Sequence, residues 1–121
     1  MDRRRDRGSP APYPRTARVN ALLREVIADE LELLGDVDDR LSMITVTAVV
    51  SDPDFRHARV LLASLSEPAA DALAQHRSRL QSAVATQARL RRTPTLEFAA
   101  DPVVAAGARV EEVLRRHRRD N

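Results

Sequence analysis

Residues 43–65 read MITVTAVVSDPDFRHARVLLASL, and this stretch decides the fold class. The β-branched residues at 43–51 predict a strand, and the apolar run at 57–65 predicts a second strand. Between them, Asp-Pro-Asp at 52–54 supplies side chains that favour a turn. The stretch therefore predicts a β-hairpin, and the patterns on either side of it predict what packs against the hairpin.

An amphipathic helix is expected before the hairpin, beginning near Arg15. Apolar residues recur there at the i, i+3, i+4, i+7 spacing of one helix face. They are Val19, Leu22, Leu23, Val26, Ile27, Leu31 and Leu34. Glu30 falls inside this apolar arc, and we expect its side chain to reach solvent at the edge of the face. Gly35 is the expected C′ residue that ends the helix, and residues 36–39, three of which are Asp, form a turn after it.

Helical character returns after the hairpin and is interrupted once. Pro68 suits the first turn of a helix, and the helical pattern then runs over residues 69–91. The sequence His-Arg-Ser-Arg at 76–79 is wholly polar, so the pattern predicts a kink or break at this point. Thr93 and Pro94 end the second helix, because the residue before a proline disfavours helical geometry.

A short strand and a final helix are expected to follow. Residues 95–100 predict a third strand, with Leu96 and Phe98 on one face. Residues 103–116 can form a last short helix, which Gly107 weakens in its middle. The predicted order is helix, strand, strand, helix, kink, helix, strand and a C-terminal appendage, which indicates the α+β fold class.

The 121 residues leave room for one ordered domain, which we assign to residues 15–116. Residues 1–14 hold four arginines and three prolines, and they have too little apolar surface to order themselves. We therefore predict a disordered basic N-terminal arm, which is either an inert tail or a segment that settles on phosphate. The arginine-rich residues 117–121 are predicted to fray.

Composition excludes several classes of protein. All 20 basic residues are arginine and the formal net charge is only +2, so the arginines reflect either a GC-rich genome or phosphate binding. The absence of cysteine excludes disulfides and thiolate catalysis. An aromatic content of 2% is too low for a sheet that stacks bases, as an RRM does. No apolar run reaches the roughly 20 residues that span a bilayer, and no signal peptide is recognisable, so a cytoplasmic location away from membranes is expected.

Enzymatic chemistry has no recognisable setting in the sequence. The chain lacks the Gly-x-x-x-x-Gly-Lys phosphate loop and contains no lysine. His57, His76 and His117 fall in separate elements without metal-ligand spacing, and each is expected to be an exposed or strand-edge histidine. Asp36, Asp38 and Asp39 are better explained as part of a solvated acidic loop than as a metal site. We therefore expect no catalytic site, no metal, no cofactor and no small-molecule substrate.

The predicted order of elements is that of the type II KH fold, a three-stranded sheet covered on one face by helices. The sequence then resembles the ribosome-binding factor A family at five places in register. The first is RTARV at 15–19, and the second is DDRL at 38–41, which matches the family's Asp-Pro-Arg-Leu except that Asp39 replaces the proline. The third is DFRHARV at 54–60, similar to Asp-Leu-x-x-Ala-Lys-Val, and the fourth is LRRTPTLEFAAD at 90–101, which matches Leu-Arg-x-x-Pro-x-Leu-x-Phe-x-x-Asp. The fifth is GARV at 107–110, similar to Gly-x-Arg-Ile. The resemblance covers the chain from Arg15 to about Leu114.

The sequence departs from the family at the kink. Family members usually carry Ala-x-Gly between the two central helices, where other KH proteins have the phosphate-clamping Gly-x-x-Gly. Here the corresponding residues are His76, Arg77 and Ser78, without glycine. A serine hydroxyl can bend a helix by bonding to the backbone, but it does not free the backbone as glycine does.

Candidate RNA-binding residues cluster on the second central helix and in the loop after it. A helical wheel with Leu80, Val84 and Gln87 inward places polar and basic residues outward. The candidates are Arg77, Ser78, Arg79, Ser82, Arg89, Arg91 and Arg92, with Arg15 and Arg18 at the start of the first helix as a second group. Arginine forks and serine hydroxyls are common donors to phosphate and sugar. The alternative is that this surface is only a solvated helix face.

The resemblance implies a non-catalytic assembly factor that binds the immature small (30S) ribosomal subunit and its 16S rRNA. Such a factor contacts RNA near the decoding region and neck, and it assists late maturation, including processing of the rRNA 5′ end. We expect the free protein to be a monomer. Two alternatives remain open, a KH-like RNA chaperone acting on other RNAs and a protein–protein adaptor.

Overall fold

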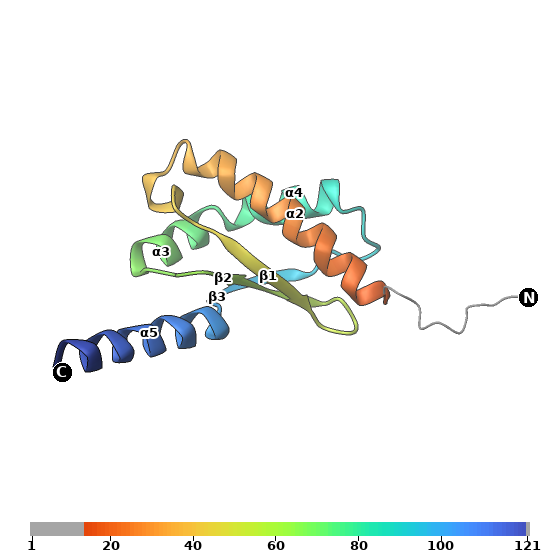
Figure 1. Cartoon of the computed structure of the whole chain (residues 1–121). Helices are drawn as coiled ribbons and strands as arrows, with labels where there is room; N and C mark the ends of the chain where they lie inside the picture. Colours follow the sequence, from red (N-terminus) through yellow and green to blue (C-terminus); the bar gives the residue numbers. More distant parts are fainter. Residues whose placement is uncertain (1–13, 121) are drawn as a thin grey trace, which may run out of the picture.

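The computed structural model describes residues 14–120, which form a mixed α+β domain (Figure 1). Its elements are α2 (Arg15–Gly35), the 3-10 helix η1 (Asp39–Leu41), β1 (Val46–Ser51), β2 (His57–Leu62), α3 (Glu67–Gln75), α4 (Arg77–Gln87), β3 (Thr95–Ala100) and α5 (Pro102–Asp120). The α+β class and the KH-like order of elements are therefore confirmed. The predicted N-terminal arm, residues 1–14, lies outside the described residues except for Pro14.

One three-stranded sheet, in the order β1-β2-β3, forms the base of the domain. β1 and β2 are antiparallel, whereas β2 and β3 are parallel, with His57 opposite Thr95 and Leu62 opposite Ala100. A parallel pair needs a crossover connection, and α3 and α4 provide it. Figure 1 shows α2, α3 and α4 on the same side of the sheet. The predicted arrangement of helices on one face is thus confirmed.

The core lies between this helical layer and the sheet. On β2, Ala58, Val60 and Leu62 are buried, while the alternating neighbours His57 and Arg59 are exposed. This alternation is the two-residue period of a strand with one covered face. On the helical side of the core, the fully buried side chains include Leu23, Ile27 and Leu34 of α2 together with Leu80 and Val84 of α4.

Both hairpin strands are shorter than the apolar runs that predict them. β1 begins at Val46 and not at 43, because the chain is still leaving η1, where the Ile44 amide donates to the Leu41 carbonyl. β2 ends at Leu62 and not at 65, because the chain turns into α3. The Ser66 hydroxyl accepts a hydrogen bond from the Ala69 amide at 3.2 Å and so caps that helix.

The predicted break between the central helices is confirmed, and it lies at His76. This residue has φ −98° and ψ 11°, so it belongs to neither α3 nor α4. The second helix ends at Gln87, four residues before the predicted end. Arg89 follows with φ 54°, the left-handed conformation of a residue that terminates a helix. The predicted inward position of Gln87 is wrong, since Gln87 is exposed and Ala88 is buried in its place.

Gly35 has a different role from the predicted one. None of the described glycines has a positive φ, so Gly35 is the last residue of α2 and not a left-handed C′ residue. A Cβ at this position would lie 3.1 Å from the Leu41 carbonyl oxygen and 3.2 Å from the Ser42 Cα. Glycine is therefore required because η1 packs directly against the end of the helix.

The C-terminal helix α5 projects away from the sheet (Figure 1). It runs to Asp120, past the predicted end at residue 116 and through most of the segment expected to fray. Asp101 fixes its start: one carboxylate oxygen accepts from the Val103 amide at 2.9 Å, and the other accepts from the Thr47 hydroxyl at 2.5 Å. Within the described residues, no helix is long and apolar enough to cross a membrane.

Candidate nucleic-acid interface

Six of the nine candidate residues fall into two groups, which lie at the two ends of the α4 region. The first group lines a broad, shallow hollow beside the break, which we call the kink hollow. Its polar lining consists of Gln75, Arg77, Ser78, Gln81, Ser82 and Thr93. Ser78 and Ser82 are exposed and lie one helical turn apart, while Arg77 is half-buried. The structure brings these three donors to one hollow, and their contact with RNA stays a prediction.

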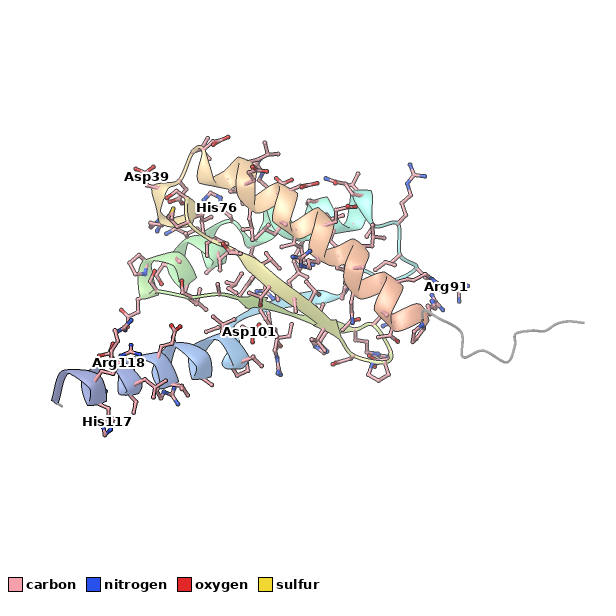
Figure 2. All side chains as sticks on the ribbon, viewed as in Figure 1. Asp39, His76, Arg91, Asp101, His117 and Arg118 are labelled. Carbon is pink, nitrogen blue, oxygen red and sulfur yellow. The ribbon has the colours of Figure 1, made fainter. Side chains whose placement is uncertain are left out.

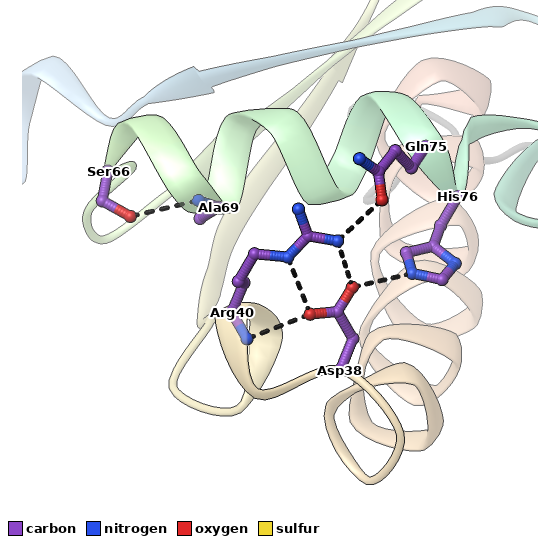
Figure 3. Close-up of polar contacts among 6 residues, drawn as sticks. All are labelled: Asp38, Arg40, Ser66, Ala69, Gln75 and His76. Carbon is purple, nitrogen blue, oxygen red and sulfur yellow. Dashed lines mark hydrogen bonds and ion pairs between the residues drawn. The ribbon is translucent and has the colours of Figure 1, made fainter.

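Side chains from distant parts of the chain hold the break itself (Figure 3). The Asp38 carboxylate accepts two hydrogen bonds from the Arg40 guanidinium, at 2.9 and 2.7 Å. The same carboxylate lies 2.9 Å from Nε2 of His76. Arg40 also donates to the Gln75 side chain at 2.7 Å. We call these four residues the kink lock, because they tie the end of α3 to the turn that follows α2.

The electrostatics of the kink lock favour its charged form. Hydrogen bonds from Arg40 and then from His76 hold the pKa of the Asp38 carboxyl far below its usual range. The hydrogen bond to Asp38 in turn raises the pKa of Arg40. The Asp38 side chain is only 12% exposed, so the pair is partly shielded from water. At neutral pH the break is therefore anchored by a carboxylate with several charge-assisted donors.

The sequence did not identify His76 as part of a contact. We expected an exposed or strand-edge histidine, but its side chain is 27% exposed and contacts Asp38 from 38 positions away. The only sequence evidence that pointed to this contact was the family-like element at 38–41. It singled out Asp38 and Arg40 but did not show which residues they bind.

Arg79 occupies a different environment from the other candidates on α4. Its guanidinium donates to the Glu30 carboxylate across the α2–α4 contact. Glu30 is buried at 8% exposure, so the predicted extension of this side chain to solvent is wrong. A carboxylate can stay in the helix interface because Arg79 supplies its partner. Arg79 therefore has a structural contact, although half of its side chain remains exposed.

The second group of candidates meets at the other end of the domain, where Figure 2 labels Arg91 beside the start of α2. Here Arg15, Arg91 and Arg92 line one pocket of about 370 Å³, which we call the Arg15 pocket. The remaining lining residues are Pro53, Asp54, Phe55 and Leu90. The structure thus joins one residue from the start of the first helix and two from the loop after α4.

Arg18 and Arg89 line neither hollow. Arg18 is exposed on the first turn of α2, and Arg89 is exposed at the left-handed position after α4. The wheel that placed Arg89 on the outer face of the helix is therefore wrong, because the helix ends before this residue.

Gln81 positions the loop that carries the second group, and no sequence signal pointed to it. Its amide nitrogen donates to the Pro94 carbonyl at 3.1 Å, and its oxygen accepts from the Leu96 amide at 2.8 Å. These two bonds fasten the start of β3 to α4. They satisfy backbone groups on the outer edge of the sheet, where no further strand of the described residues pairs with β3.

Metal-dependent chemistry has no candidate centre in residues 14–120, where no group of three or more histidine, cysteine or acidic side chains could hold an ion. The two hollows instead present arginine and serine donors on an open surface, which can bind phosphate and sugar oxygens without chemistry of their own.

Comparisons with known proteins agree with these observations. The family model described as ribosome-binding factor A matches residues 15–114. Ribosome-binding factor A of Rubrobacter xylanophilus is 39% identical over 106 residues, which are 84% of this chain and 85% of the relative. The protein of the same name from Bifidobacterium adolescentis is 38% identical over 88% of this chain and 70% of its own length.

Two solved structures extend the agreement to the fold. The crystal structure of ribosome-binding factor A from Thermus thermophilus has a TM-score of 0.64 and 34% identity, over 70% of this chain and 94% of that one. A Thermus thermophilus ribosome-binding factor A model, fitted into a cryo-EM map of a 30S complex, has a TM-score of 0.57 and 35% identity, over 66% of this chain and 88% of that one. The chain therefore belongs to the ribosome-binding factor A family.

Proposed function

We propose that this protein is a non-catalytic assembly factor that binds the immature 30S ribosomal subunit through its 16S rRNA. The observation that carries the proposal is the likeness, at 35% identity, to the Thermus thermophilus protein fitted into a 30S complex. The distribution of donors supports it. Arg77, Ser78 and Ser82 line the kink hollow, and three further arginines line the Arg15 pocket.

The mode of action follows from the kind of donor. Arginine and serine contacts to phosphate and sugar fix the position of a protein on RNA without reading its sequence. A rigid domain that binds one arrangement of the rRNA more tightly than another shifts the population toward that arrangement. We assign this role to late maturation, including processing of the 16S rRNA 5′ end, after which the factor leaves. Free protein is a monomer in this account.

A protein–protein adaptor is the second candidate, and one observation favours it. Helix α5 exposes large apolar side chains, among them Val103 at 78%, Val110 at 57% and Leu114 at 51%. Such a face can bind an apolar partner surface. Salt separates the two functions, because phosphate binding weakens steeply as salt rises whereas apolar contact does not.

The test is cosedimentation of the purified protein with mature small subunits, precursor-containing small subunits and large subunits at two salt concentrations. The proposal expects salt-sensitive binding to small subunits, tighter to the precursor form, and none to large subunits. Folded protein that binds no ribosomal particle would contradict it. Depletion in cells tests the processing role, since precursor 16S rRNA with an unprocessed 5′ end should accumulate when the protein is removed.

A further inference from the structure

The Arg15 pocket is built where three separate chain segments meet. They are the start of α2, the hairpin turn between β1 and β2, and the loop between α4 and β3. At about 370 Å³ the pocket lies in the lower part of the range for small-ligand sites, which is roughly 300–1,000 Å³. It is therefore large enough for one nucleotide and too small for a double helix.

The pocket carries positive charge that the described residues do not neutralise. Arg40, Arg56 and Arg79 each form a salt bridge with a carboxylate. By contrast, none of the three arginines of the pocket, Arg15, Arg91 and Arg92, has a salt bridge within residues 14–120.

The one acidic residue in the lining is already engaged. The Asp54 carboxylate lies 3.3 Å from Nε of Arg56 and also accepts a hydrogen bond from the Arg56 backbone amide at 3.1 Å. It is therefore a poor competitor for the three pocket arginines. The pocket as a whole favours an anionic ligand, and the planar guanidinium fork matches phosphate geometry.

The apolar side of the pocket is held in place before any ligand arrives. The Arg15 guanidinium carbon lies 5.3 Å from the centre of the Phe55 ring, within the range of a cation–π contact. Phe55 has φ 59°, and its amide donates to the Asp52 carbonyl at 2.9 Å, so the turn fixes the ring. Phe55 and Leu90 are both half-buried against the core. Because these side chains are already fixed, less conformational entropy is lost when a ligand binds.

The opposite side of the pocket is also constrained. The loop that carries Arg91 and Arg92 begins at the left-handed residue Arg89. It ends where the Gln81 side chain forms hydrogen bonds with the backbone of Pro94 and Leu96. Both anchors lie within a few residues of the two arginines. The pocket therefore combines an anion-binding rim with an aromatic and aliphatic wall, which is the combination that unstacked bases use on RNA-binding proteins.

We infer that the Arg15 pocket binds one unpaired nucleotide of RNA, with its phosphate against the arginines and its base against the wall of Phe55 and Leu90. This inference rests on the proposed RNA-binding function and names a second contact, separate from the kink hollow. It favours single-stranded RNA at this end, because a base within a duplex would first have to lose its stacking and pairing to reach the wall.

The experiment measures fluorescence anisotropy of a labelled ten-nucleotide single-stranded RNA of mixed sequence, and of an RNA duplex, with the full chain. The double variant Arg91→Gln/Arg92→Gln should lower single-strand affinity at least tenfold and flatten the salt slope by about 0.7, the value for one phosphate contact on a single strand. The control Arg115→Gln/Arg116→Gln changes the charge equally on α5 and should alter affinity less than twofold.

The aromatic wall is tested separately. Phe55→Leu should weaken single-strand binding about five- to tenfold with the salt slope unchanged, since stacking and not charge is removed. Phe55→Tyr keeps a ring and should bind as the wild type does, and duplex binding should be the same for all three proteins. Circular dichroism melts establish that each variant is folded.

Cosedimentation with small subunits is run alongside. If the arginine variant binds single strands as the wild type does, or if the wild type binds none, the pocket inference is overturned while small-subunit binding leaves the proposed function standing. If the wild type binds no small subunits, the proposed function itself fails.

Discussion

Nε2 of His76 lies 2.9 Å from Oδ2 of Asp38, and this contact spans the break between α3 and α4. The break has no glycine, and His76 is the single residue between the two helices. A side chain held by the turn after α2 thus fixes a backbone geometry that glycine would allow but not enforce. We therefore expect the direction of α4, and with it the placement of the kink hollow, to depend on this contact.

Replacing the histidine should loosen the break without unfolding the domain. In His76→Ala the carboxylate keeps Arg40, but its bond to the residue at the break is lost. We expect faster amide exchange at residues 76–79 and small-subunit binding that is roughly three- to tenfold weaker, as for a misplaced phosphate-binding surface. His57→Ala, at the exposed start of β2, is the control and should leave both measurements unchanged. Unaltered exchange in His76→Ala would contradict the role of the contact.

The Asp38 carboxylate should give the stability of the protein a specific pH dependence. Because its pKa is lowered in the folded state, its contribution is complete above the ordinary value of 3.8 and is lost as the pH falls from 3.8 toward the lowered pKa. Asp38→Asn should therefore have a lower urea midpoint than the wild type at pH 6, and the two midpoints should converge below 3.8. The neighbouring exposed Asp39→Asn serves as control. A difference that grows on acidification would be inconsistent with this assignment.

The ion pair between Arg79 and Glu30 should contribute to stability more than to RNA binding. Arg79→Gln leaves a buried carboxylate without its charged partner, and we expect a loss of about 1–2 kcal/mol in the free energy of unfolding, since half of Arg79 is exposed. The second change Glu30→Gln should restore most of this loss, because two amides can bond to each other. Urea unfolding of the single and double variants measures both effects. A double variant less stable than Arg79→Gln would rule out this explanation.

The direction of α5 should depend on the bond between Thr47 and Asp101. The Thr47 hydroxyl and then the Val103 amide hold the pKa of Asp101 below its ordinary value, so the cap is charged at neutral pH. Thr47→Val keeps the shape of the side chain but removes the donor. Limited proteolysis within α5 and amide exchange at residues 103–106 should both become faster, while the sheet stays protected. Equal protection of α5 in both proteins would show that the bond does not orient it.

Local patterns predicted the bounds of an element well where proline or other turn-forming residues mark its ends. β3 was predicted with its observed bounds, 95–100, because Pro94 precedes it and Asp101 and Pro102 follow it. The break was predicted from the polar run at 76–79. The end of α4 was placed too late, because nothing local marks Arg89 as the left-handed residue that terminates the helix.

The contacts that build the candidate interface were not predictable in the same way. Arg79 and Glu30 are 49 positions apart, and His76 and Asp38 are 38 apart. No helical or strand periodicity encodes such distances, which arise only when α2 packs against the central helices. The sequence singled out arginines of both groups, but it could not show that Arg79 is engaged internally.

Binding of precursor-containing small subunits as a function of salt tests the central claim most directly. The triple variant Arg77→Gln/Arg91→Gln/Arg92→Gln is compared with Arg109→Gln/Arg115→Gln/Arg116→Gln on α5, which changes the net charge equally. We expect the slope of log affinity against log salt to flatten by about 1.4–1.8 for the first variant only, at roughly 0.7–0.9 for each of two lost phosphate contacts, one in each hollow. A wild-type slope near zero, or equal slopes for all three proteins, would contradict RNA binding through this surface.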